Sequence, residues 1–201
     1  MNKRDFLRLA GVPVTLTALA GLAACSDPKP SFNAVDMTGA DYAKNFALKD
    51  ADGKERTLAD FKGKVVVLFF GYAQCPDVCP TTMTEMAQVK QQLGADGDKL
   101  QVLFVTVDPD RDTPEVMKAY MGAFDPAFVA LIPTQDQLAA MAKDYKAYYK
   151  KVDGKTPTSY SMDHSAASYI YDTQGRLRLY ARYGAGVAPM VADVQALIKQ
   201  G

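Results

Sequence analysis

Residues 65–80 read VVVLFFGYAQCPDVCP, an apolar, largely β-branched and aromatic run followed closely by two cysteines four positions apart. A continuous apolar run of this kind favours a strand that is buried on both faces. Helix-spaced apolar residues continue from Pro80 to Leu93, and Gly94 ends the pattern. In open α/β sheets, ligands bind at the carboxyl ends of the strands. The stretch therefore predicts a strand–loop–helix unit with Cys75 and Cys79 at the functional edge of a sheet.

Outside this unit, short apolar strands alternate with helices. We expect strands at 46–49, 100–107, 128–132, 168–171 and 176–180, the last two forming a hairpin. We expect one helical turn at 58–61 and helices starting at 113, running from 134 or 136 to 149, and spanning 189–199. This order predicts an α/β fold with a central mixed sheet flanked by helices. A thioredoxin-like arrangement is the best-known fold that carries a redox cysteine loop at this place.

The first 24 residues have the composition of an export signal. Basic residues precede an apolar run from Leu9 to Ala23, which is shorter than the roughly 20 residues that a membrane-spanning helix needs. Residues 22–25 read LAAC and resemble a bacterial lipobox, which implies cleavage before Cys25 and lipidation of its sulfur. A simple signal peptide with an incidental cysteine is the alternative. The start KRDFLR resembles a twin-arginine signal with Lys3 in place of the first arginine, so Sec and twin-arginine export both stay open.

These features divide the chain into three parts. We expect a cleaved lipoprotein-type signal peptide at 1–24, a lipidated Cys25 with its tether at 25–41, and a folded domain at 42–201. The protein is expected in a bacterial cell envelope, anchored to the membrane through its lipid and facing the periplasm. The inner membrane is the preferred location.

Thiol and soft-metal chemistry must use four residues, because the chain contains only three cysteines (Cys25, Cys75 and Cys79) and one histidine, His164. Basic and acidic residues number 23 each, so the composition gives no sign of nucleic-acid binding. The spacing of Cys75 and Cys79 places both sulfurs on one face of a helical turn, near a helix N-terminus that stabilises thiolates. A structural disulfide between them would contribute only about 2 kcal/mol, because it closes a very short loop. The pattern favours a reactive pair.

The types of ligand available limit which metal ions the chain can bind. Structural zinc sites use four protein ligands, and the mature domain offers no fourth cysteine or histidine. Two thiolates and one imidazole suit Cu(I), and also Cu(II), whereas a catalytic zinc site completed by water stays open. A lone histidine such as His164 is most often an ordinary residue; its position beside Asp163 and just before a strand adds support for a ligand role, but the residues alone leave both interpretations open. Asp163 would then orient the ring, or it would simply cap a turn.

Residues 108–113 read DPDRDT and contain three alternating aspartates. An EF-hand loop starting at Asp108 would need glycine at its sixth position and glutamate at its twelfth, and this chain has Thr113 and Ala119 there. The segment instead indicates a strand end, a turn and a helix cap, or a loop that flanks the cysteines. We count Asp77, Asp108 and Asp163 as candidates for side chains that hold the metal ligands in place, or for a loop that faces a partner protein.

Three motifs together resemble the SCO/SenC family: FFGYAQCPDVCP at 69–80, VDPDRDT at 107–113 and DHS at 163–165. The resemblance extends over about residues 42–199. It implies a thioredoxin-like fold that binds copper through Cys75, Cys79 and His164. It also implies a role in building the dinuclear copper site of cytochrome c oxidase subunit II, or in serving another copper protein.

Three functions compete at this point. The first is a copper metallochaperone that is not an enzyme. The second is a thiol–disulfide reductase, which needs Cys75, Cys79 and an external thiol reductant, but not His164. The third is a peroxidase, and it is disfavoured because Leu68 and Tyr72 replace the proline and threonine expected before a peroxidatic Cys75.

Overall fold

The computed structural model describes residues 31–156 and 159–201. The predicted signal peptide at 1–24, its predicted export motif and the predicted lipidation site Cys25 lie outside the described residues. In the part of the chain that is described, no helix is long and apolar enough to span a bilayer.

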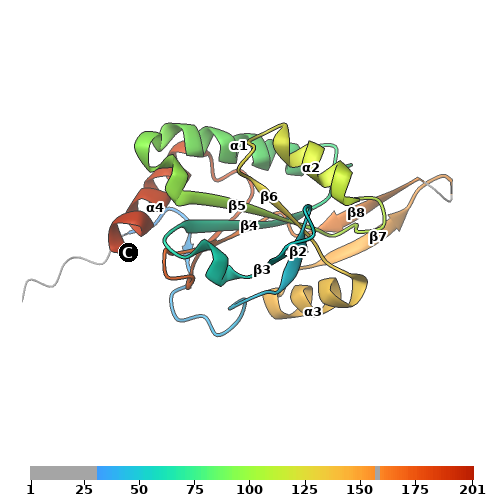
Figure 1. The fold of residues 1–201 in the computed structure, drawn as a ribbon, viewed down its shortest axis with the longest axis horizontal. Helices are drawn as coiled ribbons and strands as arrows, with labels where there is room; N and C mark the ends of the chain where they lie inside the picture. The colour runs from blue at the N-terminus through green and yellow to red at the C-terminus, as the bar shows by residue number, and fades with distance from the viewer. Residues whose placement is uncertain (1–30, 157–158) are drawn as a thin grey trace, which may run out of the picture.

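The centre of the fold is a mixed eight-stranded sheet in the order β1-β10-β9-β4-β5-β6-β2-β3 (Figure 1). The inner strand β4 (Val65–Gly71) pairs in parallel with β5 (Leu100–Thr106), and β5 pairs in parallel with β6 (Val129–Ile132). On its other side, β4 pairs antiparallel with β9 (Ser168–Tyr171), which forms a hairpin with β10 (Leu177–Ala181). The edge strands are β1 (Val35–Asp36) and β3 (Glu55–Arg56), and β2 (Leu48–Asp50) pairs antiparallel with both β6 and β3. The predicted mixed sheet is confirmed.

Helices cover the sheet from both sides. Helices α1 (Val78–Gln92) and α2 (Pro114–Gly122) lie on one side, whereas α3 (Gln135–Tyr145) lies on the other (Figure 1). The C-terminal helix α4 (Val187–Gln200) packs against α1. The short 3₁₀ segments η1 (Leu58–Phe61) and η2 (Gly94–Lys99) complete the connections. The N-cap predicted at Thr113 is confirmed, since its side chain accepts a hydrogen bond from the Val116 N–H.

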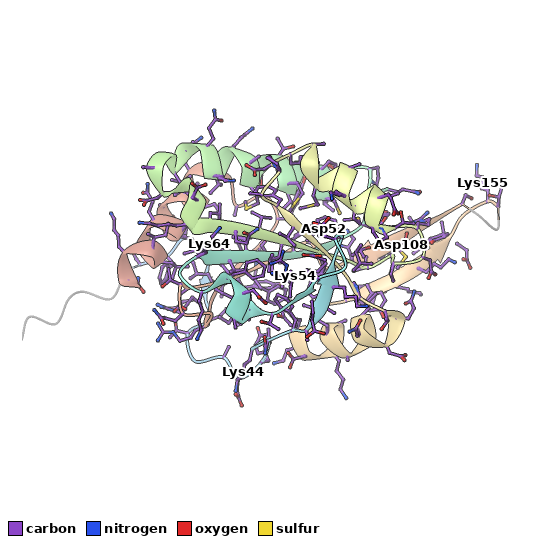
Figure 2. The ribbon with its side chains drawn as sticks, in the orientation of Figure 1. Lys44, Asp52, Lys54, Lys64, Asp108 and Lys155 are labelled. Carbon is purple, nitrogen blue, oxygen red and sulfur yellow. The ribbon has the colours of Figure 1, made fainter. Side chains whose placement is uncertain are left out.

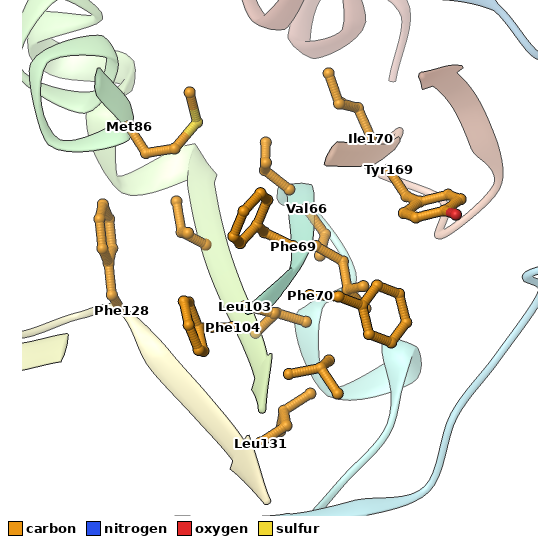
Figure 3. Close-up of a cluster of buried hydrophobic side chains, with 14 of the residues drawn as sticks. Val66, Phe69, Phe70, Met86, Leu103, Phe104, Phe128, Leu131, Tyr169 and Ile170 are labelled. Carbon is orange, nitrogen blue, oxygen red and sulfur yellow. The ribbon is translucent and has the colours of Figure 1, made fainter. Parts of the chain in front are cut away.

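The core lies along β4 and β5, where every residue is buried, as the apolar run predicted. Phe69 and Phe104 face each other in register, with ring centroids 5.9 Å apart (Figure 3). Each large apolar side chain buried in this way contributes about 1.5–3 kcal/mol to folding. The rigid pair of strands gives the loop after Gly71 a fixed base.

One predicted helix is too long. The helix expected to reach residue 149 ends at Tyr145, because Lys146 adopts a left-handed conformation with φ of 53°. The chain then enters a second, two-stranded sheet made of β7 (Tyr149–Asp153) and β8 (Tyr160–His164). This β7–β8 hairpin, which the sequence analysis missed, projects beyond the main sheet, and Lys155 lies near its tip (Figures 1 and 2). It carries His164.

The folded part begins earlier than the expected boundary at residue 42. Val35 and Asp36 form β1, which pairs with β10. The N–H groups of Asn33 and Ala34 donate hydrogen bonds of 2.9 and 2.8 Å to the carboxylate of Asp193 in α4. Part of the expected tether at 25–41 is therefore attached to the domain.

Candidate metal centre

The cysteine loop connects the end of β4 to the start of α1. The Val107 N–H donates a hydrogen bond to the Gly71 carbonyl, and the Cys75 N–H donates to the Tyr72 carbonyl, so the loop turns sharply. Cys75 precedes the helix and Cys79 lies in its first turn, with 8% and 0% of their surfaces exposed. Both thiols are free. The helix begins at Val78, two residues before the predicted Pro80. The earlier start brings Cys79 into the first turn, whereas Cys75 lies in the loop before the helix.

His164 reaches the two thiols from the end of β8. Its Nε2 lies 3.4 Å from the Cys79 sulfur, and the three potential ligand atoms of Cys75, Cys79 and His164 all lie within 4.8 Å of one another. The Nδ1 atom lies 3.0 Å from the carbonyl oxygen of Ser165. A carbonyl only accepts, so Nδ1 carries a ring proton, and in the neutral ring Nε2 is the nitrogen whose lone pair can bind a metal ion.

This geometry corrects the orienting role offered to Asp163. The side chain of Asp163 is exposed and lies opposite Lys150 in the β7–β8 hairpin. A backbone carbonyl fixes the tautomer instead, which is a common alternative to a carboxylate. Sequence reasoning missed Ser165 because backbone acceptors leave no sign in the side-chain pattern.

Aromatic rings surround the imidazole. Phe69 and Tyr72 contact the His164 ring edge-on, with centroids 5.9 and 5.8 Å away. Phe69 is fully buried and Tyr72 is nearly so. These contacts restrict the ring and keep water away from one side of the three ligand atoms.

The pKa values of the two thiols differ in opposite directions from the ordinary value of a cysteine. A hydrogen bond with Cys79 lowers the pKa of Cys75 to about 4, with smaller contributions from His164 and from the N–H groups of Asp77 and Cys79, against the opposing effect of burial. The same hydrogen bond and burial raise the pKa of the Cys79 thiol. At neutral pH the pair therefore holds one thiolate and one thiol. The predicted stabilisation of a thiolate is supported at Cys75, although the neighbouring thiol is its main cause.

The aspartates surround the centre without entering it. Asp108 is 3% exposed; its carboxylate accepts hydrogen bonds from Arg111 Nε at 2.5 Å and from the Tyr160 hydroxyl at 2.8 Å. Asp77 is exposed at the N-cap of α1 and makes no side-chain capping bond. Among the described residues, the groups of metal-ligating side chains that converge include none of these carboxylates.

Asp112 is a supporting residue that the sequence analysis placed only in a turn. Its carboxylate accepts the Ala73 N–H at 3.1 Å and the Thr106 hydroxyl at 2.5 Å, so it connects the cysteine loop to the end of β5. Asp112 is 1% exposed, and burial raises the pKa of its carboxyl. The sequence shows that Asp112 follows a buried strand, which marks it as a polar residue at the edge of the sheet. Its contact with Ala73 could not be predicted, because it requires that β4 and β5 lie side by side.

The donor set fits a soft metal ion. Three ligand atoms around an ion at bond lengths of about 2.0–2.3 Å would lie about 4 Å apart, so the observed separations need little adjustment. Two sulfurs and one imidazole nitrogen match the ligand preference of copper.

Comparisons with known proteins agree over the folded part of the chain. The SCO1/SenC family model matches residues 35–199. The mitochondrial SCO2 homologue of Bos taurus is 38% identical over 133 residues, which cover 65% of this chain and 50% of the relative. The chain spans about half the length of the first curated relatives that it matches.

Solved structures give the same result. The copper-bound ScoI of Bradyrhizobium japonicum is 38% identical with a TM-score of 0.70, covering 76% of this chain and 97% of that one. The apo Sco1 protein of Thermus thermophilus is 35% identical with a TM-score of 0.74, covering 83% and 97%. By its family match, its fold and its three metal-ligating residues, the chain belongs to the SCO1/SenC family.

Proposed function

We propose that the protein is a copper metallochaperone that carries copper on Cys75, Cys79 and His164 and helps to build the dinuclear copper site of cytochrome c oxidase. The observation that carries this proposal is the convergence of two cysteine sulfurs and one imidazole nitrogen within 4.8 Å. The copper-bound relative from Bradyrhizobium supports the choice of metal. The target follows from the family resemblance.

Copper is favoured over zinc by the number of ligands. The chain has no second histidine, and its remaining cysteine, Cys25, is assigned to the lipid anchor. Two soft sulfurs and one borderline imidazole nitrogen satisfy Cu(I) and also accept Cu(II), whereas structural zinc takes four protein ligands.

Metal binding is tested with the reduced domain from residue 31 onward. Titration with Cu(I) and Cu(II) should give one metal per chain, with thiolate-to-copper charge transfer for Cu(II). Cys75→Ser, Cys79→Ser and His164→Ala should each weaken binding strongly, whereas Asp163→Asn should not. Unchanged binding in the three ligand variants would refute the proposal. In a deletion strain, rescue of oxidase activity by added copper supports delivery.

A second function, thiol–disulfide reduction, is favoured by the free thiols and the low pKa of Cys75. The Cys75 thiolate would attack a partner disulfide and release one partner thiolate. Cys79, after losing its proton, would attack the Cys75 sulfur and release the second. The protein would leave with a Cys75–Cys79 disulfide, which an external thiol reductant must reduce. His164→Ala separates the functions, because it should weaken copper retention strongly and spare reduction.

We also propose that Cys25 is lipidated after removal of residues 1–24 and holds the domain at the periplasmic face of the inner membrane. The LAAC motif at 22–25 supports this location. In a bacterial host, the full chain should partition with inner-membrane vesicles. Cys25→Ser should keep the signal uncleaved at this site and abolish incorporation of labelled fatty acid.

A further inference from the structure

Arg111 joins the cysteine loop, the loop after β5 and the β7–β8 hairpin. Its Nε donates to Asp108, and its Nη1 donates to the Gln74 side chain at 3.1 Å and to the Tyr160 carbonyl at 2.9 Å. Its guanidinium also lies 3.5 Å from the centroid of the Tyr160 ring. We call these four residues, Arg111, Asp108, Gln74 and Tyr160, the Arg111 network.

Tyr160 is held firmly at the start of β8. Its hydroxyl donates to Asp108 at 2.8 Å, and the Lys151 ammonium lies 3.9 Å from the centroid of its ring. Cation–π contacts with partly buried cations add to the hydrogen bonds. Arg111 therefore binds Tyr160 through its ring and its backbone, and binds Asp108 alongside it.

The same strand carries the metal ligand. Tyr160, Met162 and His164 alternate along β8 with the exposed Ser161 and Asp163, so these three share the face directed at the domain. Four strand residues span about 13 Å. Because β8 is paired with β7 along its length, fixing Tyr160 restricts the direction in which the strand presents His164.

The hydrogen bonds at the other end of the hairpin do not fix the direction in which β8 presents His164. At the base, the Ser165 N–H donates to the Tyr148 carbonyl, and the Tyr148 N–H donates to the Ser165 hydroxyl. Those bonds join the two strands to each other. The Arg111 network connects the hairpin to the cysteine loop itself, through Gln74, one residue before Cys75.

We propose that Arg111 is a positioning residue that holds β8 so that His164 meets Cys75 and Cys79, and thereby sets how long the metal stays bound. The inference rests on the proposed copper function and deepens it. Arg111 touches neither the metal nor its three ligands. Supporting residues of this kind change metal affinity about 10–100-fold when they are replaced.

The test uses Arg111→Lys, which keeps the charge but cannot bridge three partners in a plane. The matched control is Arg178→Lys. Arg178 on β10 has a side chain 15% exposed, against 16% for Arg111, and donates to Thr38, Asp172 and Gln200. Transfer of Cu(I) to a competing chelator should become about 10–100-fold faster in Arg111→Lys and stay within twofold of wild type in Arg178→Lys.

A double-mutant cycle separates positioning from general damage. In a His164→Ala background, Arg111→Lys should have no further effect on copper transfer, because its influence passes through His164. An equal acceleration in both backgrounds would overturn the proposal. Tyr160→Leu, which removes the ring and the hydroxyl, provides a second variant should Arg111→Lys fail to fold, with the same expected cycle.

A measurement without metal keeps this inference distinct from the copper function. His164 is the only histidine, so its ring protons are assigned unambiguously by NMR. In the wild-type apo protein they should show Overhauser contacts to Phe69 and Tyr72, and in Arg111→Lys these should weaken several-fold. Unchanged contacts would refute the positioning role even if copper binds. Absence of copper binding in the wild type would refute the proposed function, but the NMR test of the positioning role would still be valid because it uses the metal-free protein.

Discussion

The Cys79 sulfur lies 3.4 Å from Nε2 of His164, although 85 positions separate the two residues in the sequence. The Ser165 carbonyl accepts a hydrogen bond from Nδ1–H, so Nε2 is the nitrogen without a hydrogen in the neutral ring. Because the pKa of Cys79 is raised and that of Cys75 is lowered to about 4, the metal-free cysteine pair at pH 7 carries one proton, on Cys79.

Binding of one Cu(I) at pH 7 should therefore release about one proton, since only the Cys79 thiol must lose one. Calorimetric titrations in buffers of different ionisation enthalpy measure this number. His164→Ala removes the imidazole from the count, and it should weaken binding while the Cys79 proton is still released. A release of two protons from His164→Ala would mean that both cysteines are thiols in the metal-free protein.

Cys75 should react with iodoacetamide far below the pH at which ordinary thiols react. In a Cys25→Ser background, its alkylation rate should rise with a midpoint near pH 4 and then level off, since the pKa of Cys75 is about 4. Replacing Cys79 by alanine should move the midpoint upward, because the hydrogen bond with Cys79 is the largest cause of the low pKa. A midpoint that stays near pH 4 in that variant would assign the low pKa to His164 and to the N–H groups of Asp77 and Cys79 instead.

The cysteine half of the centre could be predicted from the sequence, because strand, loop and helix lie in one local segment. The apolar run at 65–70 indicated the buried strand, and the spacing of Cys75 and Cys79 indicated the reactive pair. The family resemblance then supplied the role of His164. Its position near the thiols depends on a hairpin for which the sequence analysis found no signal.

That hairpin was missed for a physical reason. The helical pattern continues past Tyr145, and only the left-handed Lys146 ends it, at a position where lysine gives no warning. Residues 150–153 of β7 are exposed, so they lack the apolar alternation by which a half-buried strand is identified. The Arg111 network likewise depends on three loops that meet only in the folded chain.

Asp112 should support both folding and the cysteine loop. Asp112→Ala leaves the Ala73 N–H and the Thr106 hydroxyl without their acceptor and should lower the free energy of unfolding by about 1–3 kcal/mol. Asp112→Asn, which keeps an acceptor oxygen, should lose less. Urea unfolding at pH 7 measures both, and an unaffected Asp112→Ala protein would show that these buried bonds contribute nothing net.

The same carboxyl should produce a defined pH dependence. Burial raises its pKa in the folded protein, so between its ordinary value of 3.8 and the raised value the folded state holds a proton that the unfolded chain has lost. Its contribution to stability is therefore complete below about pH 4 and decreases as the pH rises through this window. The stability of wild type relative to Asp112→Asn should fall from pH 4 upward and then become constant, and a relative gain with rising pH would contradict the raised pKa.

We expect glycine to be required at position 71, at the end of β4, because the neighbouring side chains leave no room for a Cβ atom. A Cβ atom there would lie 2.7 Å from the Cys79 sulfur and 2.7 Å from Cζ of Phe104, both buried and confined by neighbouring side chains. Gly71→Ala should therefore destabilise the protein by about 1–3 kcal/mol through overpacking and should displace Cys79. We expect copper to transfer to a competing chelator at least tenfold faster than from wild type.

Gly122→Ala is the matched control, because a Cβ atom at that helix-terminal residue meets no other atom within 4 Å. It should leave copper transfer unchanged and should alter stability by at most about 1 kcal/mol, the difference between glycine and alanine in a helix. Chemical unfolding and chelator competition, run on both variants, separate the two effects. If Gly71→Ala lost stability but kept wild-type copper retention, the strain would have been absorbed by Phe104, and the position of the Cys79 sulfur would not depend on this glycine.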